Sequence, residues 1–331
     1  SVGIQPDILV LRTEHELSTN LKKKVALFCN VDENAVVQSI DMPTIYEVPL
    51  RMQEQGLDVT ILQKMGLPVG ETPTLGPWRD FLDRRHKATK KVKIGLVGKY
   101  DLQDAYKSIL EALSQAATYN DRKADIHFIN SEKLTDANVE EQIKEMDGII
   151  ICPGFGQRGI EGKFVAIKYA RTHNVPTFGI CLGMQCMAIE FARNVLGYTD
   201  ANSREMDEKT PHNVIDIMEE QKAITNMGGT MRLGAYECIL DQHSKTFEAY
   251  KSEHIQERPR HRYEFNNDYK QEYEKAGMKC VGTNPESDLV EIIEIPTLKW
   301  FIGVQFHPEY SSTVLKPHPL FLSFIKAAID K

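Results

Sequence analysis

Residues 178–185 read Phe-Gly-Ile-Cys-Leu-Gly-Met-Gln, an apolar run that ends in a Gly-X-Cys-X-Gly turn and opens a helix. Small residues at Gly179 and Gly183 permit the sharp strand-to-helix turn of a nucleophile elbow, which lifts one side chain above a sheet. A thiol at a helix N-terminus is favoured as the thiolate, which is the attacking form. We therefore predict Cys181 as a nucleophile, although the motif alone fits a structural turn equally well.

A second segment supplies a candidate base. Residues 300–309, Trp-Phe-Ile-Gly-Val-Gln-Phe-His-Pro-Glu, form an apolar run that stops at a histidine and a carboxylate. In an extended segment His307 and Glu309 project from the same side, so the carboxylate can orient the imidazole ring. We predict a triad of Cys181, His307 and Glu309. A loop with a satisfied histidine is the structural alternative for this segment.

The order of apolar segments predicts the fold class. Strands and helices alternate from residue 92 onward, which indicates an α/β fold whose parallel sheet is flanked by helices, with active groups at the carboxyl ends of strands. The later apolar runs either extend this sheet or form an antiparallel ribbon that carries His307. The expected strands are 92–97, 126–129, 148–152, 175–180, 289–295 and 300–306, and the expected helices are 104–119, 138–146 and 162–172.

The first 66 residues are too few for a stand-alone core. Apolar runs at 6–11 and 25–29 predict two buried strands, so residues 1–66 read as the end of a larger domain. Residues 67–91 are first rich in Pro and Gly and then basic, which predicts a linker with a short helix. The third part, 92–331, is the predicted catalytic domain.

The composition of the chain argues against several classes of protein. The chain has 331 residues, a net charge of −7 and six cysteines without regular spacing. We expect no nucleic-acid binding, no metal site, no disulfide framework and no membrane span, and a cytoplasmic location. The five cysteines other than Cys181 are expected to be buried or half-buried apolar residues.

A third glycine cluster follows the expected strand 148–152. Its sequence, Pro153-Gly154-Phe155-Gly156-Gln157-Arg158-Gly159, allows backbone N–H groups to face a ligand. Acyl transfer passes through an oxyanion, which the N–H groups of Gly154 and of the residue after Cys181 could stabilise. A phosphate-binding loop and a plain tight turn remain alternatives.

These motifs together resemble the class I (triad) glutamine amidotransferases. Further segments resemble the CTP synthase family over nearly the whole chain; they are 3–7, 26–31, 98–100, 104–108, 228–234 and 260–266. The resemblance implies a class I amidotransferase sheet, preceded by the end of a P-loop-type α/β amidoligase domain. It also implies that glutamine hydrolysis supplies ammonia for the amination of UTP to CTP with ATP and Mg²⁺, that GTP is an allosteric activator, and that the complete enzyme is a homotetramer.

The resemblance also implies roles for individual residues. Glutamine contacts are expected at Gly154, Leu182, Gly183, Met184, Gln185, Glu205 and Arg262. A response to GTP is expected at Arg158, Gly229, Thr230 and Arg232, and pyrimidine nucleotide or ATP contacts at Lys24, Ile40, Asp41 and Met42. A mobile solvated loop explains the residues of the GTP set almost as well. For Lys24 a solvated charged helix end is the favoured interpretation.

The chain departs from the family in two places. It begins at Ser1 inside the amidoligase part, and no Gly-X-X-X-X-Gly-Lys-Ser/Thr sequence occurs in it. We therefore expect at most glutaminase activity from this chain alone, without CTP formation. Pro153 stands where the family more often has glycine and lacks an N–H, so Gly154 must serve as the oxyanion donor. A noncatalytic assembly or regulatory module and another Cys-His γ-glutamyl hydrolase are the alternative functions.

Overall fold

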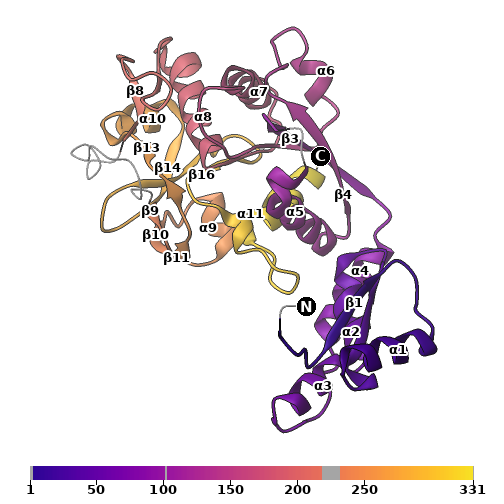
Figure 1. Ribbon diagram of the computed structural model, residues 1–331. Helices are drawn as coiled ribbons and strands as arrows, with labels where there is room; N and C mark the ends of the chain where they lie inside the picture. Colours follow the sequence, from indigo (N-terminus) through magenta and orange to yellow (C-terminus); the bar gives the residue numbers. More distant parts are fainter. Residues whose placement is uncertain (1–2, 101–102, 218–231, 331) are drawn as a thin grey trace. The chain divides into compact units, whose positions relative to one another are not determined.

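The computed structural model describes residues 3–100, 103–217 and 232–330 (Figure 1). Its contacts divide the chain into two compact units, Ser1–Asp83 and Arg84–Lys331, and each is described by itself. The division falls within α4 (Gly76–Lys87), the helix that follows the Pro- and Gly-rich segment.

The first unit is built on a two-stranded parallel sheet. In this sheet β1 (Leu9–Thr13) pairs with β2 (Val36–Ile40). The helices around it are α1 (Thr19–Cys29), α2 (Val48–Glu54), α3 (Leu57–Lys64) and the first part of α4. Tyr46 and Phe81 pack edge to face in its small core, with ring centroids 5.2 Å apart.

One predicted strand of this unit is wrong. Residues 25–29 are the second half of α1, not a strand. The Ser18 hydroxyl caps this helix by accepting the N–H of Leu21 at 3.3 Å, and Asn30 ends it in a left-handed conformation. A short apolar run does not by itself distinguish a strand from a helical segment.

The apolar residues of α1 do not form a helix face that packs in a core. Only Ala26 in this helix is buried, whereas Leu27 and Phe28 are 84% and 92% exposed.

The second unit contains the predicted α/β sheet. Its strand order is β11-β10-β14-β15-β16-β6-β5-β3-β4. The strands from β4 to β16 are parallel, and those from β16 to β11 are antiparallel, so the later apolar runs extend the sheet. The strands are β3 (Lys91–Gly98), β4 (Lys123–Asn130), β5 (Gly148–Ile151), β6 (Thr177–Ile180), β10 (Tyr236–Leu240), β11 (His254–Glu257), β14 (Lys279–Thr283), β15 (Val290–Glu294) and β16 (Phe301–Val304).

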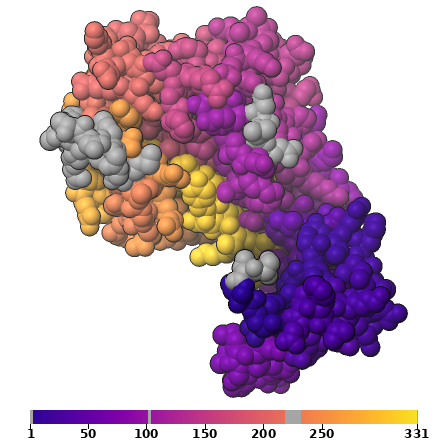
Figure 2. All heavy atoms as spheres, in the orientation of Figure 1, coloured from indigo at the N-terminus to yellow at the C-terminus, as the bar shows by residue number. Residues whose placement is uncertain are grey.

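Helices cover both faces of this sheet, each over its own apolar core (Figure 1). One face carries α6 (Val139–Ile143), α7 (Ile160–Thr172), α8 (Leu182–Phe191) and α10 (Lys270–Ala276). The other carries α5 (Lys107–Tyr119), α9 (Lys245–Tyr250) and α11 (Pro319–Ile329). In Figure 2 the yellow C-terminal atoms lie between orange and magenta ones, since α11 packs on both α9 and α5.

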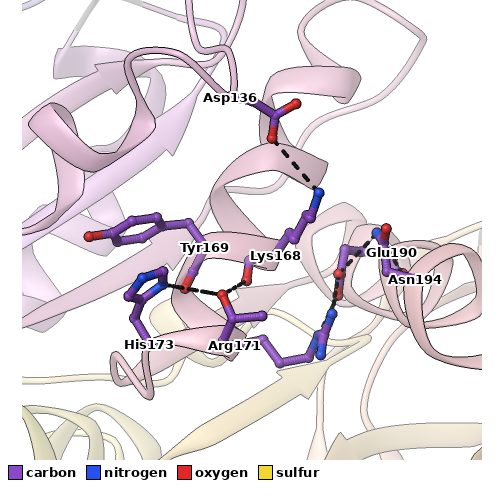
Figure 3. Close-up of polar contacts among 8 residues, drawn as sticks. Asp136, Lys168, Tyr169, Arg171, His173, Glu190 and Asn194 are labelled. Atoms are coloured by element: carbon purple, nitrogen blue, oxygen red, sulfur yellow. Dashed lines mark hydrogen bonds and ion pairs between the residues drawn. The ribbon is translucent and has the colours of Figure 1, made fainter.

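A buried ion pair joins α7 to α8. Nε and Nη2 of Arg171 donate to the carboxylate of Glu190 at 2.9 and 2.7 Å (Figure 3). The side-chain amide of Asn194 donates to the same carboxylate at 3.2 Å. The Glu190 side chain is fully buried. This bidentate contact fixes the helix that begins directly after Cys181.

Two small sheets complete the unit beside the carboxyl ends of the central strands. One contains β13 (Tyr263–Phe265), β8 (Asn213–Ile217) and β7 (Asn202–Ser203), and the other pairs β9 (Arg232–Leu233) with β12 (Arg260–His261). No helix in the described part of the chain is long and apolar enough to cross a membrane.

Candidate active site

Cys181 lies on a sharp turn between β6 and α8. Its φ of 53° and ψ of −108° are uncommon for a residue with a side chain, and such strain is concentrated at functional sites. Glycine is required on both sides of the turn. A Cβ at Gly183 would overlap the carbonyl oxygen of Ile151, and one at Gly179 would overlap the sulfur of Met187.

His307 pairs with Glu309 and faces the same cavity as Cys181. Its Nδ1 lies 2.7 Å from Oε1 of Glu309. The sequence suggested an extended segment at this point, and the structure differs. Residues 308–310 form a short 3₁₀ turn that brings the carboxylate back to the ring. Because Nδ1 is engaged by Glu309, Nε2 is left for the thiol.

The charge state of His307 follows from its partners. Burial lowers the pKa of His307, but the hydrogen bonds and charges of Cys181 and Glu309 outweigh it and raise this pKa to about 10. The imidazolium is therefore the favoured form at neutral pH. The ring of Tyr310 stacks on the imidazole with the centroids 5.2 Å apart, which restricts its orientation.

Two glutamines support the thiol from the adjoining strand and helix. The amide of Gln305 donates to Sγ of Cys181 at 3.7 Å, and its oxygen accepts from Gln185 at 3.1 Å. Gln185 in turn donates to the carbonyl of Tyr263 at 2.9 Å. The Cys181 thiol also lies 3.9 Å from the carbonyl oxygen of Arg260.

The predicted glycine turn begins where β5 ends, beside the elbow. Lys163 donates to the carbonyl of Cys152 at 2.6 Å, and Lys99 donates to the carbonyl of Phe155. The carboxylate of Glu205 accepts the N–H of Gly156 at 3.0 Å. The turn is therefore held by charged side chains at both of its ends.

A cavity of about 560 Å³ lies between the elbow, the glycine turn and the β12–β13 segment. Seven of the ten predicted triad and glutamine residues line it: Gly154, Cys181, Leu182, Gln185, Glu205, Arg262 and His307. Glu309 lies behind His307, while Gly183 packs on β5 and Met184 is fully buried in the core.

The two described residues expected to respond to GTP, Arg158 and Arg232, do not line this cavity. The exposed Arg158 pairs with Glu132 at 3.2 Å. Arg232 is buried in an ion pair with Glu291 and lies over the ring of Tyr236. Gly229 and Thr230 lie outside the described residues.

The predicted amidoligase contacts all belong to the first unit. Lys24 is exposed on α1, Ile40 ends β2, and Asp41 pairs with Arg12. Met42, which is half-buried, follows directly.

Several residues at or near the cavity were not predicted as site residues from the sequence. Gln305 could have been found, since in a strand it projects from the same side as His307. Lys163 and Tyr310 belong to no motif named from the sequence, whereas Arg260 and His261 lie in the segment 260–266, which was named without a role for either residue. Among the described residues, no group of three or more His, Cys, Asp or Glu side chains could hold a metal ion.

This arrangement places a cysteine on a strand-to-helix elbow, beside a cavity that is also lined by a histidine whose ring is held by a carboxylate. The chain belongs to the class I glutamine amidotransferase family, whose model matches residues 101–327. A second model, the CTP synthase N-terminus, matches residues 1–67. Over both regions the sequence is therefore of the CTP synthase type.

Curated relatives agree along the whole chain. A CTP synthase of Bacteroides fragilis is 80% identical over 100% of this chain, and one of Porphyromonas gingivalis is 61% identical over 99% of it. The chain spans 62% and 61% of the lengths of these two relatives. A solved structure, described as the Trypanosoma brucei CTPS glutaminase domain with bound acivicin, is 40% identical. The match covers 73% of this chain and 95% of that domain, with a TM-score of 0.68.

Proposed function

We propose that the second unit hydrolyses L-glutamine through Cys181, His307 and Glu309. The observation that carries this proposal is the position of His307, which pairs with a buried carboxylate and lines the same cavity as Cys181. An imidazolium beside the thiol supports a thiolate–imidazolium pair, which is the reactive state of a cysteine hydrolase.

The reaction follows from this pair. The sulfur of Cys181 attacks the carboxamide carbon, and the oxyanion is stabilised by the N–H groups of Gly154 and Leu182. His307 then gives its proton to the departing nitrogen, so that ammonia leaves and a thioester remains. Water, deprotonated by the now neutral His307, attacks the thioester and releases glutamate and the thiolate.

The charges around the cavity suit the rest of the substrate. The carboxylate of Glu205 can pair with the α-ammonium of glutamine, and the guanidinium of Arg262 with its α-carboxylate. Both side chains line the same cavity as Cys181.

We also propose a role for the released ammonia within a complete enzyme. By similarity to the CTP synthases, the ammonia is expected to serve ATP- and Mg²⁺-dependent amination of UTP to CTP in pyrimidine biosynthesis. Activation by GTP, a homotetramer and a cytoplasmic location remain predictions for that enzyme.

Ammonia release from L-glutamine by the purified chain tests the proposal, with and without GTP. Cys181→Ala should reduce the rate at least about 1000-fold, whereas Cys280→Ala, which removes a half-buried thiol, should leave it within about twofold. Labelling by an electrophilic glutamine analogue or by acivicin, followed by peptide mass spectrometry, should locate the adduct on Cys181. A chain that neither releases ammonia nor is labelled at Cys181 would contradict the proposal.

A further inference from the structure

Gln305 is a buried polar residue that touches the sulfur of Cys181 and that the proposed reaction does not use. It directly follows β16 and is 1% exposed. The main chain sets it beside the nucleophile, because the N–H of Cys181 donates to the carbonyl of Val304 at 2.7 Å. From this position the side-chain nitrogen of Gln305 reaches the sulfur at 3.7 Å. Burying an amide is costly unless its hydrogen bonds are made, so these contacts decide what the side chain does there.

The orientation of the Gln305 amide follows from a chain of contacts that begins at a backbone carbonyl. The carbonyl oxygen of Tyr263 is an acceptor, so the side-chain nitrogen of Gln185, 2.9 Å away, donates to it. The same nitrogen lies 3.1 Å from the amide of Gln305, which therefore presents its oxygen to Gln185. The nitrogen of the Gln305 amide is then left for the sulfur. Gln305 consequently faces Cys181 as a hydrogen-bond donor.

Gln305 and the main chain of Arg260 have opposite effects on the charge of the sulfur. The carbonyl oxygen of Arg260, 3.9 Å from Sγ of Cys181, accepts a hydrogen bond from the neutral thiol. The amide of Gln305 donates, and a donor favours the charged form of the group that accepts it. A cysteine nucleophile attacks as the thiolate, so the donor from Gln305 favours the reactive form.

The main chain around Gln305 is held independently of its side chain. The N–H of Gln305 donates to the carbonyl of Glu291 at 2.8 Å, and the N–H of His307 donates to the carbonyl of Arg258 at 3.2 Å. A substitution of the Gln305 side chain therefore leaves in place the backbone hydrogen bonds that position His307. The effect of the amide on the sulfur can thus be measured separately from the folding of this segment.

We propose that Gln305 is a further catalytic residue, which stabilises the thiolate of Cys181 by donating a hydrogen bond to it, with its amide oriented from Tyr263 through Gln185. The expected effect on turnover rests on the proposed function. The effect on the thiolate does not, because the reactivity of the thiol can be measured without glutamine.

The test is the pH dependence of alkylation of Cys181 by iodoacetamide in the purified chain, read by peptide mass spectrometry. Gln305→Met removes the donor and keeps the length of the side chain. Gln305→Asn keeps an amide but is one methylene shorter, so its nitrogen does not reach the sulfur. Gln115→Met is the matched control, since Gln115 is also buried in this unit and its amide oxygen accepts from the hydroxyl of Ser312 at 2.8 Å.

Both Gln305 variants should move the midpoint of the alkylation profile upward by about half a pH unit or more, because the thiolate loses a donor. Gln185→Met should move it in the same direction by a smaller amount, because the amide of Gln305 is then free to turn. For glutamine hydrolysis, Gln305→Met should lower kcat about tenfold with KM within about twofold. Gln115→Met should change neither the midpoint nor kcat.

An unchanged midpoint in a folded Gln305 variant would overturn the inference, and an unchanged midpoint in folded Gln185→Met would overturn the orientation from Tyr263. Thermal unfolding identifies the folded variants, and if Gln305→Met does not fold, Gln305→Asn decides. A shifted midpoint in a chain whose wild type releases no ammonia would reject the glutaminase proposal for this chain and still support the donor to Cys181. Ammonia release without a shift would do the reverse.

Discussion

Phe28 and Phe178 both occur in apolar runs that the sequence predicts as buried strands, yet they end in opposite surroundings. Phe178 lies on β6, fully buried, with the rings of Trp300 and Phe321 at 5.1 and 5.3 Å. Phe28 lies on α1 of the first unit and is almost fully exposed. The difference teaches that apolarity identifies a core residue only where enough neighbouring elements exist to cover it.

The largest effect on stability is expected in the second unit, where the carboxylate of Glu190 is fully buried beside Arg171. Arg171→Met should lower the free energy of unfolding by about 3–5 kcal/mol, because the Glu190 carboxylate would remain buried without its cation. Chemical denaturation measures this. The exposed pair of Lys168 provides the control, since Lys168→Met should cost less than about 1 kcal/mol. Equal losses for the two variants would show that burial does not distinguish the ion pairs.

The next effect concerns the elbow. Gly183→Ala should cost about 3 kcal/mol, since its Cβ would meet the backbone oxygen of Ile151, which cannot rotate away. Gly197→Ala is not a suitable control because of its positive φ, whereas Gly70→Ala in the first unit meets no atom and should be nearly neutral. A neutral Gly183→Ala would mean that β5 and α8 can separate without cost.

An intermediate effect depends on pH. Burial, reinforced by the charge of Arg232, lowers the pKa of His261 to about 3. Between pH 6.5 and 3 the unfolded chain binds this proton and the folded chain does not, so the free energy of unfolding falls as the pH falls. At pH 5 the loss is about 2 kcal/mol.

This loss can be assigned with substitutions. His261→Asn should flatten the pH dependence of unfolding between pH 6.5 and 5, while His243→Asn, at an exposed position, should leave it unchanged. A dependence that persists in His261→Asn would assign the acid sensitivity to other groups.

The smallest effect on stability is expected at Phe28, in the first unit. Phe28→Ser should change the stability of the first unit by no more than about 0.5 kcal/mol, because the ring already lies in water. Phe81→Ala in the same unit removes a ring that is 1% exposed and should cost about 3–5 kcal/mol. A large loss for Phe28→Ser would show that its ring is covered in solution.

These expectations also mark what the sequence could predict. The parallel strands and the elbow were accessible, because alternation and glycine spacing are local signals. The direction of β15 relative to β16 was not, since apolar runs specify burial without specifying a partner. The strand predicted at 25–29 failed because its length and composition suit a helix equally well. Lys163 and the burial of His261 had no local signal, as their environments are made by residues distant in the chain.

The contact between Gly183 and Ile151 has a consequence for how the chain tolerates insertions. Ile151 immediately precedes the turn that carries Gly154, and Gly183 is two residues beyond Cys181. One backbone contact therefore sets the spacing between the attacking atom and the oxyanion donor. Loops elsewhere in the unit can lengthen without altering that spacing, whereas a single residue added between Ile151 and Gly154, or between Cys181 and Gly183, would change it directly.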